Sequence, residues 1–144
     1  MQPESIAARP ALSGVKQLLT SAGLPTEDLT DGHCEQFFYL GSADTPSGLI
    51  GLELFDDVAL LRSLAVAEDL RHAGAGSALV THAEQVARAA GVRTIYLLTT
   101  TAEKFFAKRG YVRATRESAP PAIRATPEFA GICPASSAFM TRTL

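Results

Sequence analysis

The sequence predicts an α/β fold in which a mixed sheet carries helices on its faces. Strand-like apolar runs and helical periodicities follow in the order strand, helix, three strands, helix, strand, helix and two strands. A hairpin is predicted in the middle of this order, so the strands are not all parallel. The 144 residues, of which 47% are hydrophobic, suffice for one buried core, and we expect a single domain over 1–144.

The N-terminal part predicts a short strand, a helix and a second strand. Over 5–25, a strand and a turn precede a helix that Gly23 is expected to end. The apolar face of this helix consists of Val15, Leu18, Leu19 and Ala22. The run 34–41 is typical of a strand, and the polar run 42–48 is expected to be a loop.

Two longer strands are predicted next. The runs 49–55 and 58–66 are joined at Asp56–Asp57, a dipeptide typical of a hairpin turn. Both runs are apolar at nearly every position, as expected of strands buried on both faces in the middle of a sheet.

The C-terminal half alternates helices and strands. A long helix is predicted after Gly74, with Gly91 at its end. Its apolar positions are Ala75, Leu79, Ala83, Val86, Ala87 and Ala90. A strand over 92–99 and a short helix over 101–110 follow, with a threonine available as N-cap and Gly110 as terminator. The last predicted segments are a strand over 111–116, an irregular or weakly helical run broken by prolines over 119–136, and a strand over 137–144.

Composition excludes several classes of function. The formal net charge of −2 argues against wholesale nucleic-acid binding, which needs a basic excess. Cys34 and Cys133 lack metal-ligand spacing, so we expect two free thiols in a reducing compartment and no metal site. No signal peptide is evident, and no apolar run approaches the ~20 residues of a membrane span. The sequence therefore predicts a cytoplasmic protein that does not bind membranes.

The segment before the long helix carries the clearest functional pattern. The first amide groups of a helix lack internal partners, and with the helix dipole they attract anions. Gly74 and Gly76 would let a phosphate approach the backbone, and Arg71 supplies a matching charge. The alternative is that the glycines only form a tight turn. The pattern is not a Walker motif, and Leu79 replaces the third glycine of the dinucleotide fingerprint.

Two motifs together resemble a known family. The stretch LAVAEDLRHAGAGSAL over 64–79 resembles the acetyl-CoA motif of the GCN5-related N-acetyltransferases (GNAT). The stretch IYLLTTTAEKFFAKRGYVR over 95–113 is similar to the family's second cofactor-facing element. The resemblance implies the GNAT fold, with six to seven strands, a splayed strand pair and acetyl-CoA as cosubstrate. The implied pyrophosphate ligands are backbone amides of Arg71, His72, Ala73, Gly74, Ala75, Gly76 and Ser77.

The resemblance also implies where the rest of the cosubstrate lies. Pantetheine would lie as a pseudo-strand between the strand that ends at Val66 and the strand over 93–99. A backbone amide near Leu64 or Ala65 would stabilise the oxyanion of the thioester, which makes Leu64 a catalytic position. Further residues implied to contact the cosubstrate are Thr99, Ala102, Phe105 and Phe106.

Departures from the family pattern concern acid and base. Leu60 and Arg62 stand where a glutamate is often found, so Glu53 on the neighbouring strand becomes the candidate base, with an outward-facing surface residue as the alternative. Phe106 matches the tyrosine that often protonates the leaving thiolate, and a phenyl ring donates no proton. Thiolate departure, water or another hydroxyl such as that of Tyr111 would then serve.

Three arginines are candidate anchors for an acidic substrate. Arg62 lies in an apolar strand, so it needs an anionic partner, which is either a carboxylate such as Glu53 or a substrate anion. Arg116 and Arg124 could add to an anion-binding lip, or could be solvated surface charges.

The sequence is also similar to short N-acetyltransferases associated with arsenic-resistance operons, through 105–140 and the runs LLRSLAV and YLLTTTAE. A related branch acetylates glutamate-like organoarsenical and phosphinic antibiotics. This implies a small acidic amine as substrate and permits a homodimer through the last strands. A sensor that binds acyl-CoA without turnover and a protein or peptide acetyltransferase stay open as alternatives, as does arsenic binding by Cys133.

Overall fold

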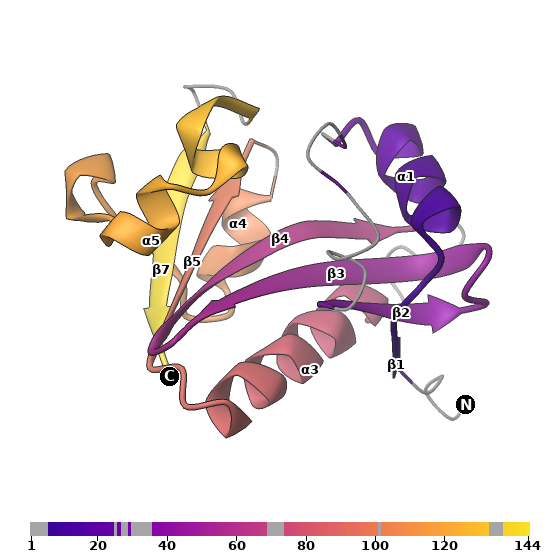
Figure 1. Cartoon of the computed structure of the whole chain (residues 1–144), viewed down its shortest axis with the longest axis horizontal. Coiled ribbons are helices and arrows are strands. Elements are labelled where there is room, and N and C mark those ends of the chain that lie inside the picture. Colours follow the sequence, from indigo (N-terminus) through magenta and orange to yellow (C-terminus); the bar gives the residue numbers. More distant parts are fainter. Residues whose placement is uncertain are drawn as a thin grey trace. The chain divides into compact units, whose positions relative to one another are not determined.

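The computed structural model of the chain describes residues 6–24, 26, 29, 36–68, 74–100, 102–132 and 137–144. These residues form a seven-stranded sheet in the order β1-β2-β3-β4-β5-β7-β6 (Figure 1). The pair β4 and β5 is parallel, whereas β1 with β2, β2 with β3, and β7 with both β5 and β6 are antiparallel. The predicted mixed sheet with helices is confirmed.

The strands are β1 Ala7–Ala8, β2 Phe37–Gly41, β3 Pro46–Phe55, β4 Val58–Val66, β5 Thr94–Thr99, β6 Val112–Arg113 and β7 Ala138–Thr143. The α-helices are α1 Leu12–Ser21, α3 Ala75–Ala89, α4 Glu103–Ala107 and α5 Pro121–Arg124. A 3₁₀ turn, η2 Arg116–Ser118, and a π-turn, η3 Glu128–Ile132, flank α5. Among the described residues, no helix is both long enough and apolar enough to cross a membrane.

The chain divides into two compact units. The first comprises Met1–Leu52 and Arg62–Val86, and the second comprises Glu53–Leu61 and Ala87–Leu144. The first therefore holds α1, most of α3 and the strands β1 and β2, and the second holds β5, β6, β7 and the shorter helices.

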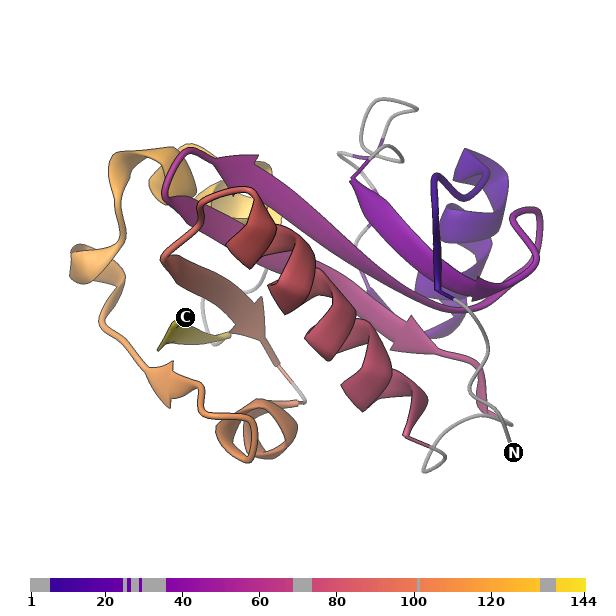
Figure 2. The same ribbon diagram turned by 90° about the horizontal axis from the view of Figure 1, so that it is seen from below.

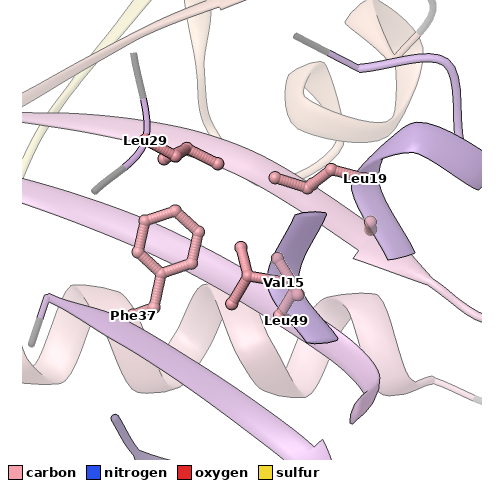
Figure 3. Close-up of a cluster of buried hydrophobic side chains, with 6 residues drawn as sticks. Val15, Leu19, Leu29, Phe37 and Leu49 are labelled. Atoms are coloured by element: carbon pink, nitrogen blue, oxygen red, sulfur yellow. The ribbon is translucent and has the colours of Figure 1, made fainter. Parts of the chain in front are cut away.

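In the first unit, two helices cover opposite faces of β2. Phe37 packs with Val15 and Leu19 of α1 in a buried apolar cluster (Figure 3). The next residue, Phe38, places its ring edge-on to His82 of α3, with 4.8 Å between the centroids. Since successive side chains of a strand point to opposite faces, α1 and α3 lie on the two sides of this part of the sheet (Figure 1). In Figure 2, α3 lies in front of the long strands.

In the second unit, the proline-rich segment covers one face of the sheet. Ala119 and Ile123 pack against Leu60 and Phe139, and all four are buried. Phe139 also stacks on Tyr96 at 5.5 Å and meets Phe129 edge-on at 5.4 Å. The remaining side chains packed on this cluster are Phe55, Val58, Leu98 and Ala114. The segment predicted to be irregular or weakly helical thus supplies apolar cover.

Most expected elements are confirmed, and three local expectations are wrong. The strand β3 begins at Pro46, so the expected loop over 42–48 is shorter; a proline is tolerated as the first residue of a strand. Ala102, and not a threonine, is the N-cap of α4, and no side chain caps that helix. The strand expected over 111–116 is reduced to Val112–Arg113 because the chain turns into η2 at Arg116.

Candidate active site

The N-terminus of α3 has the features expected of an anion site. Gly74 precedes the helix with a left-handed φ of 83°, and its carbonyl accepts the first helical hydrogen bond from Ala78 at 3.0 Å. The amides of Ala75, Gly76 and Ser77 therefore occupy the first turn, where the helix offers no internal acceptor. No acidic residue lies in that turn to compete with a bound anion. Three further predicted ligands, Arg71, His72 and Ala73, lie outside the described residues.

The end of β4 contains an irregularity that the sequence did not indicate. Ser63 has a left-handed φ of 59° inside the strand, a conformation that is uncommon for a residue other than glycine. Beyond it, Ala65 is buried in the cluster of α1, whereas Leu64 and Val66 are half-buried. The register between β4 and β5 runs from Val58–Thr94 to Leu61–Leu97, and β4 itself continues to Val66. The expected position of pantetheine beside Leu64, Ala65 and Val66 stays a prediction.

Arg62 is a buried cation with a specific packing environment. Only 3% of its surface is exposed, and its Nε–H donates a hydrogen bond to Ser63 Oγ at 3.0 Å. A Cβ at Gly51 would lie 2.9 Å from Arg62 Cγ and 2.8 Å from the ring of Phe37. Gly51 is therefore needed for the arginine stem to pass. The choice between a structural ion pair and a substrate anion stays open.

Glu53, the candidate base, lies in the second unit near the end of β3. Its side chain is half-buried and has an interaction partner, so both the catalytic interpretation and that of an outward-facing surface residue stay open. By strand alternation it shares a face with Phe55, which packs on the Leu60–Phe139 cluster. A catalytic role for Glu53 stays a prediction.

The helix α4 places its aromatic residues against the core. Phe106 is buried, with its ring edge-on to Tyr111 at 5.4 Å and to Phe105 at 5.1 Å. Tyr111 is only 1% exposed and has an interaction partner within the structure, so it packs in the core. A role of its hydroxyl as proton donor stays a prediction. The guanidinium of Arg109 covers one face of Phe105 at 3.8 Å.

Thr99, which the resemblance implies to contact the cosubstrate, has a local partner. Thr99 Oγ1 accepts a hydrogen bond from the amide of Ala102 at 3.0 Å, which closes the turn between β5 and α4. Both residues are half-buried. Thr99 and Ala102 thus shape the entry to α4, and a contact with the cosubstrate stays a prediction for both.

Arg116 and Arg124 brace the proline-rich segment, a role not anticipated from the sequence. Arg116 Nη2 donates to the carbonyl of Ser137 at 2.9 Å. Arg124 donates through Nε to the carbonyl of Ala119 at 2.9 Å and through Nη2 to the carbonyl of Glu117. Each guanidinium carries five donors, so these bonds do not prevent a substrate contact, which stays a prediction.

No cluster of three or more potential metal ligands occurs in the part of the chain that the structure describes. Cys34 and Cys133 lie outside it, so the predictions of free thiols and of arsenic binding are untested.

The comparison with protein families defines the class of protein. The sequence matches the Acetyltransferase (GNAT) family model over residues 13–111, a span that contains β4, β5, α3 and α4. The chain therefore belongs to the GNAT acetyltransferase family, whose members use acetyl-CoA.

Two relatives with similar sequences are amino-acid acetyltransferases. An amino-acid acetyltransferase of Ralstonia nicotianae is 40% identical over 65 residues, which are 45% of this chain and 14% of that protein. One of Ectopseudomonas mendocina is 39% identical over 66 residues, which are 46% of this chain and 15% of the relative. The chain thus spans only a small part of these relatives' length.

Solved structures share the fold. An N-acetylglutamate synthase from Neisseria gonorrhoeae, complexed with coenzyme A and N-acetyl-glutamate, has a TM-score of 0.82 at 22% identity and covers 100% of this chain and 36% of its own. Rv2747 from Mycobacterium tuberculosis, in complex with CoA and NLQ, has a TM-score of 0.74 at 19% identity, and the match covers 97% of this chain and 99% of Rv2747. At these identities the likeness shows the fold.

Proposed function

We propose that this chain transfers an acetyl group from acetyl-CoA to the amine of an acidic amino acid such as glutamate. The observation that carries the proposal is the family match, which runs across the N-terminus of α3 after Gly74 and the end of β4 after the left-handed Ser63. The names of the amino-acid acetyltransferases from Ralstonia and Ectopseudomonas support an amino acid as acceptor. The acidic choice is supported by the gonococcal synthase with N-acetyl-glutamate.

The first step is binding of the pyrophosphate at α3. The amides of Ala75, Gly76 and Ser77 and the positive end of the helix dipole suit a doubly charged ligand. Space at Gly74 is open, since a Cβ built there would meet nothing within 4 Å. Arg71 would add a charge-assisted contact from the preceding segment.

The second step is attack on the thioester carbonyl. The left-handed φ of Ser63 changes the direction of the backbone that follows, and an amide near Leu64 or Ala65 would donate to the developing oxyanion. The amine attacks in its neutral form, the C–N bond forms, and the C–S bond breaks as the tetrahedral intermediate collapses. Loss of one oxyanion donor costs ~10²–10³-fold in rate in enzymes of related chemistry.

The proton of the amine and the leaving sulfur of coenzyme A involve different groups of the protein. Glu53 would take the ammonium proton, directly or through water, so Glu53→Gln should lower the rate and change its pH profile. An unchanged rate and profile would exclude Glu53 as the base. Because Phe106 carries no hydroxyl and Tyr111 is buried, the leaving sulfur departs as thiolate or receives a proton from water.

Arg62 is proposed to attract the acceptor's anionic group. Its Nε–H is directed to Ser63, which fixes the fork, and a bidentate contact would be lost in Arg62→Lys. A raised KM for acidic acceptors is the expected result, and an unchanged KM for every acidic acceptor would exclude this role.

A narrower acceptor class is a glutamate-like organoarsenical or phosphinic amino acid. It rests on the resemblance of 105–140 to arsenic-resistance-associated acetyltransferases, whereas the amino-acid acetyltransferases of Ralstonia and Ectopseudomonas bear no such name. Ordinary glutamate is therefore the first acceptor to test.

One observation favours a second candidate, a sensor that binds acyl-CoA without turnover. The position of the usual thiolate-protonating tyrosine is taken by Phe106, whose ring is packed between Phe105 and Tyr111. Such a protein would bind acetyl-CoA without amine-dependent turnover.

A product assay distinguishes the two candidates. Purified protein is incubated with acetyl-CoA and a panel of glutamate, aspartate, glutamine, phosphinic and arsonic analogues, polyamines and short peptides. The proposal predicts an acetylated product, seen by mass spectrometry, with an acidic amino acid and with a lower KM than for glutamine or the polyamines. Product only with peptides would favour a protein acetyltransferase instead.

A further inference from the structure

A buried hydroxyl in the second unit has no partner. Ser137 is 6% exposed, and its Oγ is the buried side-chain atom without a hydrogen bond among the described residues. Burying a hydroxyl without a partner costs free energy, and native structures rarely retain such a group without a reason such as a bound water or ligand. The surroundings of Ser137 indicate which class of ligand its hydroxyl would bind.

Ser137 lies at the carboxyl end of β5, under the proline-rich cover. Ala138, the next residue, pairs with Thr99, the last residue of β5. Phe139 packs in the cluster with Ile123, and Ser137, which directly precedes β7, is buried two residues before it. In open α/β sheets, ligands bind beyond the carboxyl ends of parallel strands, and β5 is one of the two strands of the parallel pair β4 and β5.

A cation converges on the same residue. Arg116 Nη2 lies 2.9 Å from the carbonyl oxygen of Ser137, and its guanidinium carbon lies 5.6 Å from the centroid of the Phe129 ring. The hydrogen bond and the ring hold the planar fork beside the residue that carries the unpaired hydroxyl. A guanidinium and a hydroxyl together offer N–H and O–H donors, which a carboxylate accepts and an ammonium group does not.

We propose that Ser137 and Arg116 form the subsite that receives a carboxylate of the acceptor, with Ser137 Oγ–H as a specificity-determining donor. The proposal rests on the proposed acetylation of an acidic amino acid. Since Oγ is covered in the ligand-free chain, the half-buried side chain of Arg116 shifts to admit the carboxylate, a rotamer change common at binding sites.

The test compares Ser137→Ala with Ser118→Ala. Ser118 lies in the same segment, but its hydroxyl is exposed and donates to the carbonyl of Thr115 at 2.6 Å, so this variant is the matched control. KM is measured for L-glutamate, for acetyl-CoA and for 1,4-diaminobutane, an amine without a carboxylate, together with the melting temperature of the free protein.

A ligand donor and a merely structural hydroxyl give different results. For Ser137→Ala, the proposal predicts a KM for L-glutamate raised about tenfold, as loss of a hydrogen bond to a charged group implies. The KM values for acetyl-CoA and 1,4-diaminobutane stay unchanged, and the melting temperature does not fall because the lost hydroxyl had no partner. A lower melting temperature with an unchanged KM for L-glutamate overturns the proposal and assigns the hydroxyl to a buried water.

Binding measurements separate this proposal from the proposed function. If the wild type acetylates L-glutamate but Ser137→Ala has the same KM, only the subsite is wrong. If the wild type acetylates no acidic amine, calorimetric titration of the CoA-loaded protein with L-glutamate still decides: weaker binding by Ser137→Ala supports the subsite. Equal binding, or no binding by the wild type, overturns it.

Discussion

Arg62 donates its Nε–H to the hydroxyl of Ser63, the next residue along β4, at 3.0 Å. The two side chains can meet because Ser63 has a φ of 59°, which interrupts the alternation of the strand. A buried cation and a strained backbone are thus joined at the point where β4 leaves its registered pairing with β5 at Leu61. The hydrogen bond and the backbone strain at Ser63 can be tested separately.

Substitutions of Ser63 separate the hydrogen bond from the backbone strain. Ser63→Ala removes one acceptor of the buried Arg62 and keeps a left-handed non-glycine residue, so the free energy of unfolding should fall by about 1–3 kcal/mol. Ser63→Gly also loses the acceptor but relieves the strain, so it should be about 1 kcal/mol more stable than Ser63→Ala. Urea unfolding of both variants measures this difference, and equal stability of the two would contradict the backbone strain at this position.

Two glycines at the ends of α3 form a matched pair. Gly74 and Gly91 have φ values of 83° and 91°, and a Cβ at either would meet nothing within 4 Å. Substitution of either by alanine should lower the free energy of unfolding by about 1 kcal/mol, because only the backbone is strained. Only Gly74→Ala should weaken acetyl-CoA binding, measured by calorimetric titration, since Gly74 precedes the proposed pyrophosphate site. Equal affinities of the two variants would argue against that site.

Because Gly51 lies against Phe37 and Arg62, we expect the effects on stability of substitutions at Gly51 and Phe37 to be strongly coupled. In Gly51→Ala the new methyl would lie 2.8 Å from the ring of Phe37 and 2.9 Å from Arg62 Cγ, so we expect a loss of about 1–3 kcal/mol from overpacking. Adding Phe37→Leu should recover part of this loss. A double-mutant cycle measured by urea unfolding tests it, and simple additivity of the two changes would be the contrary result.

The environment of His82 predicts a pH dependence of stability. Burial lowers the pKa of His82 below its ordinary value of 6.5. Well above pH 6.5 the imidazole is neutral in both the folded and the unfolded chain. As the pH falls below 6.5, the unfolded chain binds the proton first, so stability decreases until the pH passes the folded pKa.

The His82→Gln variant lacks this titration. Relative to it, the wild type should lose stability between about pH 7 and the folded pKa of His82, as measured by urea unfolding across that range. A constant difference between the two proteins over the acidic range would show that His82 takes up its proton equally well in both states.

Features set by local pattern could be predicted from the sequence. The α3 helix followed from apolar residues at helical spacing, and Gly91 from its position after them; the structure gives that glycine a left-handed φ. The hairpin at Asp56–Asp57 followed from two apolar runs, and the turn places Asp56 at a φ of 56°.

Features that depend on residues far away in the sequence could not be predicted from it. The left-handed φ of Ser63 lies inside a strand, and serine gives no local signal for such a residue. The bond from Arg116 joins it to the carbonyl of Ser137, 21 residues away, so the arginine reads as a solvated charge in the sequence. The unpaired hydroxyl of Ser137 is likewise visible only once β7 is placed beside β5.

The central claim is acetyl transfer to an acidic amino acid, and the direct measurement is thiol release from acetyl-CoA with and without L-glutamate. The account predicts release that saturates with L-glutamate and yields one acetylated amine per thiol. Release that is indifferent to every acidic amine, from protein that nevertheless binds acetyl-CoA, would contradict it.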